Sequence, residues 1–128
     1  MGINERRSML KLTSETLPAR SAEIEEISGK PIPYELDEAS FEQAGAEAIE
    51  FIDNLSCHRL NMALRRICVD AIGTEAVRNG LKLVRLINTT DGSCSLEFAD
   101  GVLSMKNDYT QRTYSSDSAI HELLCRVL

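Results

Sequence analysis

The hydrophobic positions of the chain follow a helical period first and a strand period later. From Asp37 onward, apolar residues recur every three or four positions, which places them on one face of an α-helix: Phe41, Ala44, Ala48, Ile52 and Leu55. Asn54 and Ser56 offer a stop and a new N-cap, so a second helix is predicted from about residue 56 to residue 72, ending at Gly73. Two helices joined by so short a break predict an N-terminal helical hairpin. Thr74 can cap one further short turn, closed by Asn79 and Gly80.

After Gly80 the hydrophobic period becomes two, which is typical of strands. Residues 81–87, 94–98 and 102–106 are predicted strands, separated by the turn signals Asp91-Gly92 and Asp100-Gly101. Residues 109–114 are predicted to add a polar edge strand. The pattern therefore predicts a three- to four-stranded antiparallel β-meander. Residues 115–118, a serine-rich N-cap cluster, then open a C-terminal helix.

The first 35 residues differ from the rest of the chain. They contain all three prolines and a polar, weakly periodic sequence, so residues 1–35 are predicted to be a partly ordered polar extension. Within it, residues 32–36 could add a short edge strand. Residues 36–128 are predicted to form a single α+β domain, in which helices cover one face of the sheet.

Composition narrows the classes of partner. Twenty acidic residues against 14 basic ones give a net charge of −6, which argues against nucleic acid, because such partners are bound by clustered Lys and Arg. No stretch approaches the ~20 apolar residues of a membrane span, and no secretion signal is recognised. We therefore expect an acidic, cytoplasmic protein with neither a nucleic-acid nor a membrane partner. The four cysteines are scattered without a CxxC pair, so they are expected to be reduced, small apolar side chains.

The segment 54–70 concentrates two cysteines, a histidine and three arginines. On a helical wheel its core side is Leu60, Leu64, Ile67 and Ala71. Cys57 and Cys68 lie at the edge of that arc, but eleven residues at ~1.5 Å rise separate them by ~16 Å. A disulfide or a shared zinc between them is therefore excluded within one helix.

A second stripe on the same helix is the predicted interaction site: His58, Met62, Arg65 and Val69. A surface helix normally has one apolar stripe, so a second indicates either burial on both sides or contact with a partner. Both interpretations stay open at the level of sequence. Met and Arg are enriched at protein interfaces, which favours a partner as the functional interpretation.

The sequence HELLC, residues 121–125, resembles the HExxH motif of metalloproteases, with Cys125 in place of the second histidine. His121 and Cys125 share a helix face at i, i+4, so two ligands could converge there. The motif supplies no third ligand, and no nucleophile elbow or phosphate-binding glycine loop is present. We therefore predict no metal site, no cofactor and no catalytic residue.

Charge is arranged in blocks. Residues 37–56 carry six acids and no Lys or Arg, and residues 57–90 carry six Lys or Arg and two acids. The structural interpretation is an antiparallel helix pair with complementary flanks. The functional one is a bipolar surface that selects a charged partner.

Two functions follow as hypotheses. The first is a small non-enzymatic protein-interaction module (an adaptor, chaperone or regulator) that acts through a helix face and pairs with itself as a homodimer or with another protein. The alternative is a ligand-binding domain or enzyme that uses His58, His121 or the thiols in a pocket between helices and sheet. Metal analysis and native mass separate the two.

Overall fold

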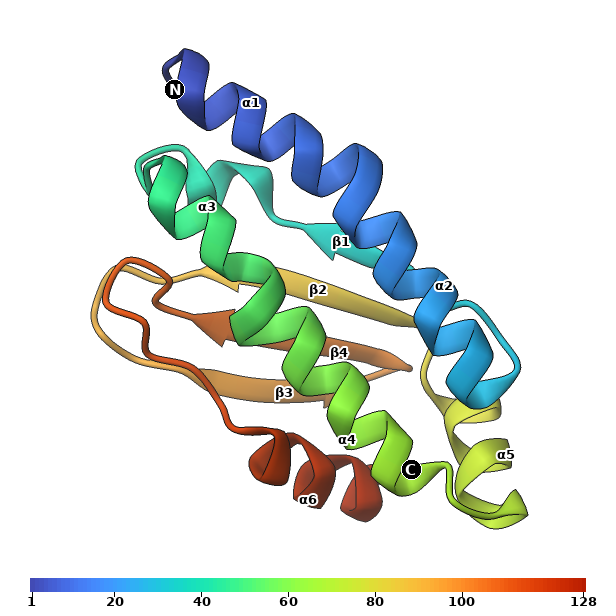
Figure 1. The fold of residues 1–128 in the computed structure, drawn as a ribbon. Coiled ribbons are helices and arrows are strands. Elements are labelled where there is room, and N and C mark those ends of the chain that lie inside the picture. Colours follow the sequence, from blue (N-terminus) through green and yellow to red (C-terminus); the bar gives the residue numbers. More distant parts are fainter.

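The computed structural model describes residues 1–128 as a layer of helices packed on one face of a mixed sheet (Figure 1). The first long helix comprises α1 (Ile3–Lys11), a π-helical turn (Leu12–Thr16) and α2 (Leu17–Ser28). It ends at Gly29, whose φ of 87° is the left-handed conformation that favours glycine at a helix C-terminus.

Residues 3–28, which the sequence places in a partly ordered extension, are helical and bury Leu12, Leu17 and Ile24 against the core. The spacing of five between Leu12 and Leu17 is not an α-helical repeat. The π turn lies between them and adds one residue, so both side chains reach the same face. Pro18 is tolerated because it lies in the first turn of α2, directly after the π turn.

The second long helix comprises α3 (Ala46–Ile52), a π turn (Asp53–His58) and α4 (Arg59–Ile67). The predicted break at Asn54 and Ser56 is absent, because the helix continues through the π turn and buries Ser56 and Cys57. The helix also begins later than predicted. Residues 38–41 form a 3₁₀ turn, and the helix starts after Gly45, whose φ is 86°.

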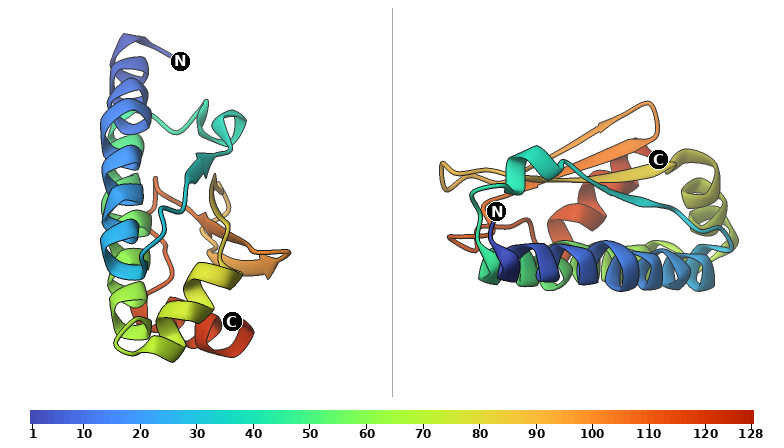
Figure 2. Two further views of the ribbon diagram at one scale, coloured as in Figure 1. Left: turned by 90° about the vertical axis from the view of Figure 1, so that its right-hand side faces the viewer. Right: turned by 90° about the horizontal axis from the view of Figure 1, so that it is seen from above.

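The two long helices lie side by side and run in the same direction, α1 beside α3 and α2 beside α4 (Figures 1 and 2). The two N-terminal helices are thus residues 3–28 and 46–67 and run parallel, whereas the sequence predicted both helices of the hairpin within residues 37–72. No helix in the structure combines the length and the apolar character needed to cross a bilayer.

After α4 the chain turns into α5 (Ala71–Gly80), ten residues where a single short turn was predicted. The carboxylate of Asp70 caps this helix by accepting a hydrogen bond from the N–H of Gly73 at 2.8 Å. Gly73 therefore lies in the first turn of α5 and does not end α4, which stops at Ile67. A methyl group at Gly73 would lie 1.8 Å from the carbonyl oxygen of Ile67, so only glycine fits this close approach.

The sheet is mixed, so the prediction of an antiparallel meander is wrong. Its order is β1 (Tyr34–Leu36), β2 (Leu83–Asn88), β4 (Val102–Asn107) and β3 (Ser95–Ala99). β1 and β4 are both parallel to β2, and only β3 and β4 pair antiparallel. The predicted edge strand at 32–36 is confirmed as β1.

Burial explains why β4 and not β3 lies beside β2. The inward side chains of β2 and β4 are fully buried, whereas those of β3 are half-buried and alternate with exposed Glu97. β4, the more apolar strand, lies in the centre of the sheet beside β2. After Asp91-Gly92 the chain crosses to β3 at the far edge of the sheet. The hairpin at Asp100-Gly101 is confirmed by the pairing of β3 with β4. The fully buried apolar side chains on this face of β2 and β4 are Val84, Leu86, Leu103 and Met105.

Residues 109–114 do not form the predicted edge strand. They form a turn closed by a bridge between Asp108 and Thr113, and Tyr109 is buried at its base. The predicted C-terminal helix is confirmed as α6 (Asp117–Val127), whose first turn is capped by the hydroxyl of Ser116, which accepts from Ala119 N at 3.1 Å. The α+β class is confirmed, with the core between the helices and one face of the sheet (Figure 2).

Candidate functional site

The predicted interaction residues lie on the outer surface of the second long helix and just past its end. His58 is half-buried, Met62 is 42% exposed, and Arg65 lies 3.5 Å from the carboxylate of Glu23 on the neighbouring helix. Val69 is 76% exposed, but it lies in the turn after Ile67 and is not part of the helix. The stripe therefore faces solvent and continues into the turn before α5.

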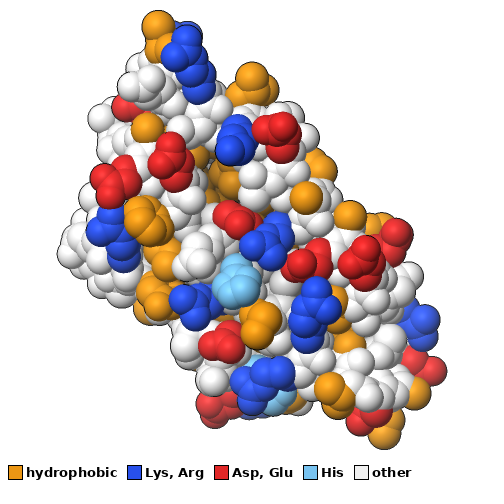
Figure 3. Space-filling model, in the orientation of Figure 1, with side chains coloured by type: hydrophobic (Ala, Val, Ile, Leu, Met, Phe, Trp, Pro, Cys, Tyr) orange, Lys and Arg blue, Asp and Glu red, His pale blue; other side chains and the backbone are white.

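A larger apolar surface surrounds Val69. It is formed by the end of α4, the start of α5 and one side of α6, around a cavity of about 340 Å³. Ile72 is 82% exposed there, the most exposed large apolar side chain of the chain. Figure 3 shows separate hydrophobic side chains at the lower right, over α5, with charged side chains of both signs beside them. We call this surface the apolar corner. Its apolar residues are Ile67, Val69, Ile72, Ala76 and Leu128, over a floor formed by buried Leu124.

The chain turn explains why this apolar surface is exposed. Because α5 folds back directly after α4, the first residues of α5 sit at the end of the molecule, beyond the reach of the sheet. Val77 points inward and is fully buried, whereas Ile72, five residues earlier, points away. A single exposed apolar side chain is normal, but exposed apolar side chains that lie together, such as Val69 and Ile72 beside this cavity, are typical of an interaction surface.

His121 and Cys125 lie at the edge of the same cavity. Their shared helix face is confirmed, since His121 Nε2 and Cys125 Sγ are 3.5 Å apart. No group of three or more His, Cys, Asp or Glu side chains could hold a metal ion together. His58 and His121 belong to different elements and line no common cavity, and the cavity that holds His121 lies between helices rather than between helices and sheet.

The remaining thiols differ in burial. Cys57 is fully buried, and burial raises the pKa of its thiol far above the ordinary value, which makes it unreactive. Burial also raises the pKa of half-buried Cys68. Cys125 is the exposed cysteine of the chain, so thiol chemistry with a solvent-borne reagent is directed to it.

A polar network joins the two long helices and β1. Arg20 binds Asp53 through two hydrogen bonds, at 2.7 and 2.9 Å, and also Glu23 at 3.1 Å. Asn61 donates to Glu23 at 2.6 Å and accepts from the hydroxyl of Tyr34 at 2.7 Å. The sequence pattern gives no signal for this network, because its members lie on separate elements and only Arg20 and Glu23 are close in the chain.

The network changes the ionisation of its members. The hydrogen bond from Asn61 lowers the pKa of Glu23, and the neighbouring Arg20 and Arg65 lower it further, against the opposing effect of burial. Burial raises the pKa of the Tyr34 hydroxyl well above its ordinary value. At neutral pH the network therefore holds ionised Glu23 and a protonated tyrosine, an arrangement suited to joining helices.

The acidic and basic blocks follow one another within the second long helix and so do not face each other as an antiparallel pair. One residue of each block pairs with the first long helix: Asp53 of the acidic block binds Arg20, and Arg65 of the basic block contacts Glu23. Other members pair elsewhere, Glu47 with Arg112 and Arg85 with Glu35.

A second buried polar cluster lies beneath the helices. The hydroxyls of Ser56 and Tyr109 are hydrogen-bonded to each other, and Asn107 donates to Ser56 at 3.1 Å. Burial raises the pKa of Tyr109, so this hydroxyl stays protonated. The cluster fixes the loop after β4 to the π turn of the second long helix, and of its three members only Tyr109 borders a surface cavity.

Comparison with known proteins identifies no relative of this chain. No protein-family model matches the chain, and no curated protein or solved structure is significantly similar to it.

Proposed function

We propose that the protein is a non-enzymatic interaction module that pairs with a second copy of itself through the apolar corner. The observation that carries this proposal is the exposure of Val69 and Ile72, at 76% and 82%, beside an apolar cavity. Apolar side chains exposed together and surrounded by polar ones are typical of a surface that is covered by a partner.

A second copy is the occupant that the local charges favour. Arg66 and Asp70 lie at the edge of the apolar corner, with opposite charges four residues apart. In a twofold contact, Arg66 of each copy can lie opposite Asp70 of the other copy. A patch that carries both charges can therefore be complementary to itself. In the same twofold contact, the protruding side chain of Ile72 in each copy can enter the cavity of the other copy.

The predicted stripe joins this surface at Val69. Met62 and Arg65 lie on the exposed side of α4, which leads into the turn that holds Val69, so they extend the contact along α4 in the proposed dimer. Arg65 remains tied to Glu23, which places a charged pair at the rim and the apolar side chains at the centre, as in other protein interfaces.

Sedimentation of the wild type and three glutamate variants tests the proposal. Ile72→Glu places an unpaired charge in the contact and should convert the dimer to a monomer with little change in melting temperature. Met62→Glu should weaken the dimer less. Leu10→Glu is the control, because Leu10 is 66% exposed on α1, away from the corner, and should leave the dimer intact.

Two results would contradict the proposal. The first is a wild type that stays monomeric at high concentration. The second is dissociation by Met62→Glu but not by Ile72→Glu, which would assign the contact to the helix stripe and not to the corner.

The alternative function, a thiol-dependent ligand-binding domain or enzyme, has one supporting observation. His121 and Cys125 touch at the edge of a cavity large enough for a small ligand. If this pair is functional, iodoacetamide should modify Cys125 markedly faster in the wild type than in His121→Ala. Equal rates would leave Cys125 as an ordinary exposed thiol.

A further inference from the structure

The strand β1 is a short edge strand whose outer side borders a cavity. It pairs only with β2, with Tyr34, Glu35 and Leu36 in register with Val84, Arg85 and Leu86. Edge strands normally protect their unpaired backbone groups with charge, a bulge or a covering element. Here the first long helix runs past the strand but leaves a space of about 410 Å³ between them.

The ladder identifies which backbone groups point away from the sheet. The carbonyl of Pro33 accepts from Val84 N at 3.0 Å, and Asp37 N donates to the carbonyl of Leu86 at 3.0 Å. Because backbone groups alternate in direction along a strand, Glu35 also faces β2, whereas the N–H and C=O groups of Tyr34 and Leu36 face the open edge. No hydrogen bond outside the ladder engages these groups.

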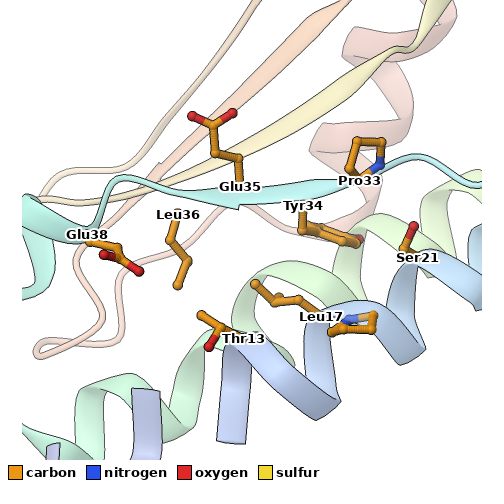
Figure 4. Close-up of a pocket in the computed structure, with 9 residues that line it drawn as sticks. Thr13, Leu17, Ser21, Pro33, Tyr34, Glu35, Leu36 and Glu38 are labelled. Atoms are coloured by element: carbon orange, nitrogen blue, oxygen red, sulfur yellow. The ribbon is translucent and has the colours of Figure 1, made fainter. Parts of the chain in front are cut away.

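The cavity beside this edge has a defined lining (Figure 4). Tyr34 and Leu36 point from the strand toward the helices, while Glu35 points to the opposite side. The first long helix contributes the small side chains Thr13 and Ser21, together with Leu17 and Pro18. Small hydroxyl side chains over an apolar floor leave room for one apolar side chain of an incoming segment.

The charges at the cavity are all of one sign. Its charged lining residues are Glu35 and Glu38, and no Lys or Arg lines it. Glu35 contacts Arg85 at 3.5 Å, whereas Glu38 is exposed and makes no ion pair. A free carboxylate at the mouth of the cavity favours a cationic side chain on the ligand.

We propose that β1 is a strand-addition site for an extended peptide segment of a partner protein that carries a lysine or arginine. The peptide backbone pairs with Tyr34 and Leu36, one apolar side chain enters the cavity over Leu17, and the cation lies against Glu38. This mode of recognition takes affinity from main-chain hydrogen bonds and specificity from pockets for alternate side chains. The site shares no residue with the apolar corner, so it does not depend on the proposed dimer.

A second copy of this chain fits the edge less well. Twofold pairing of β1 with itself would bring the carboxylates of both copies together, and only Glu35 has a cation beside it, Arg85, whereas Glu38 has none. The other free edge strand, β3, carries exposed Glu97. Like charges placed opposite each other destabilise strand pairing, so the charges favour a basic partner.

The test uses the full chain and a defined probe. The probe is a fluorescent, end-capped nonapeptide in which valine and threonine alternate between terminal lysines; its counterpart has terminal glutamates. We expect saturable binding of the lysine peptide, measured by anisotropy, and clearly weaker binding of the glutamate peptide. Amide hydrogen exchange should slow at Tyr34 and Leu36 on binding, while Glu35 is already protected in the free protein.

Matched variants locate the site. Thr13→Tyr fills the cavity and should weaken the lysine peptide roughly tenfold or more. Ser14→Tyr is the control, because Ser14 is also exposed, makes the same kind of hydrogen bond back to the helix, and does not line the cavity. Glu38→Lys should reverse the preference between the two peptides.

The proposal is overturned if the lysine peptide does not bind saturably, if Thr13→Tyr and Ser14→Tyr bind it equally, or if both peptides bind alike. Concentration-dependent protection of Tyr34 and Leu36 without any peptide would also overturn it, because a second copy would then be the occupant. Loss of the dimer in Ile72→Glu with peptide binding intact would separate this site from the apolar corner.

Discussion

Arg20 and Asp53 connect the two long helices through two parallel hydrogen bonds, Nε to Oδ1 at 2.7 Å and Nη2 to Oδ2 at 2.9 Å. Their side chains are 23% and 33% exposed, so the pair is partly shielded from water. Two-point pairs of this kind are the stronger class of ion pair. The contact sits at the π turn of the second helix, where the i→i−4 ladder is interrupted and a lateral partner fixes the backbone.

Replacing Asp53 with asparagine should lower the free energy of unfolding by about 1 kcal/mol, after allowance for solvent screening. Urea unfolding followed by circular dichroism measures this loss. Glu97→Gln is the matched control, because the Glu97–Lys106 pair is 63% and 35% exposed and should change stability by less than about 0.5 kcal/mol. Equal losses would mean that the Arg20–Asp53 pair is an ordinary surface contact.

Acid should weaken the contact between the long helices through Glu23. The folded protein holds the pKa of Glu23 below its ordinary value, chiefly through the hydrogen bond from Asn61 and then through Arg20 and Arg65. The resulting stability is fully present above the unfolded pKa of about 4.3 and is lost as the pH falls through the lower folded value. Unfolding curves between pH 6 and roughly pH 3 should show this fall, and Glu23→Gln should make it shallower. An unchanged slope in the variant would assign the acid sensitivity to other carboxylates.

Two glycines should respond differently to the same substitutions. At Gly73 the limit is space, since an added methyl group would meet the carbonyl oxygen of Ile67, so alanine and asparagine should both destabilise by about 1–3 kcal/mol. At Gly29 the nearest atom to an added methyl group would be 3.5 Å away, so there is space, and the limit is the left-handed backbone (φ 87°, ψ 4°), which asparagine tolerates better than alanine. Thermal melts of the four variants test this contrast. Rescue by asparagine at Gly73 would show that the backbone there relaxes around the added atoms.

Removal of residues 1–28 should abolish cooperative unfolding. The segment buries Leu12, Leu17 and Ile24, each worth about 1.5–3 kcal/mol, which together rival the total stability of a typical domain. Calorimetry of the truncated chain measures the effect. Removal of residues 1–8 is the control, because none of them is buried, and it should move the melting temperature little. A cooperative transition in the longer truncation would show that the first helix is an accessory.

The sequence predicts those parts of the fold that depend on local signals. The C-terminal helix follows from the serine cap at Ser116, and the β3–β4 hairpin follows from Asp100-Gly101, because capping and turn chemistry act within a few residues. The α+β class follows from the change of hydrophobic period near Gly80. These signals need no knowledge of what lies across the core.

The features that the sequence does not predict depend on contacts between distant parts of the chain or on a departure from the α-helical repeat. The residues near Asp91-Gly92 do not indicate that β2 pairs with β4, which begins eleven residues later, and not with β3. That pairing depends on which strand is apolar enough to occupy the buried centre of the sheet. The hydrophobic pattern does not predict the first long helix, because the π turn breaks the α-helical repeat between Leu12 and Leu17. For the interaction surface, the pattern identifies Val69 as part of a surplus stripe and places Ile72 near it, but it does not show how exposed either residue is, because exposure at a chain turn depends on where α5 folds.

The π turns have a consequence for how this chain tolerates changes in length. Each long helix contains one residue more than a continuous α-helix would need between the same buried positions: Leu12 to Leu17 in the first and Ile52 to Cys57 in the second. Deleting one exposed residue from a π turn, such as Ser14, would leave a spacing of four, and both flanking side chains would still face the core. One residue can therefore be deleted from either long helix while its buried side chains still face the core, a tolerance that is usually found in loops.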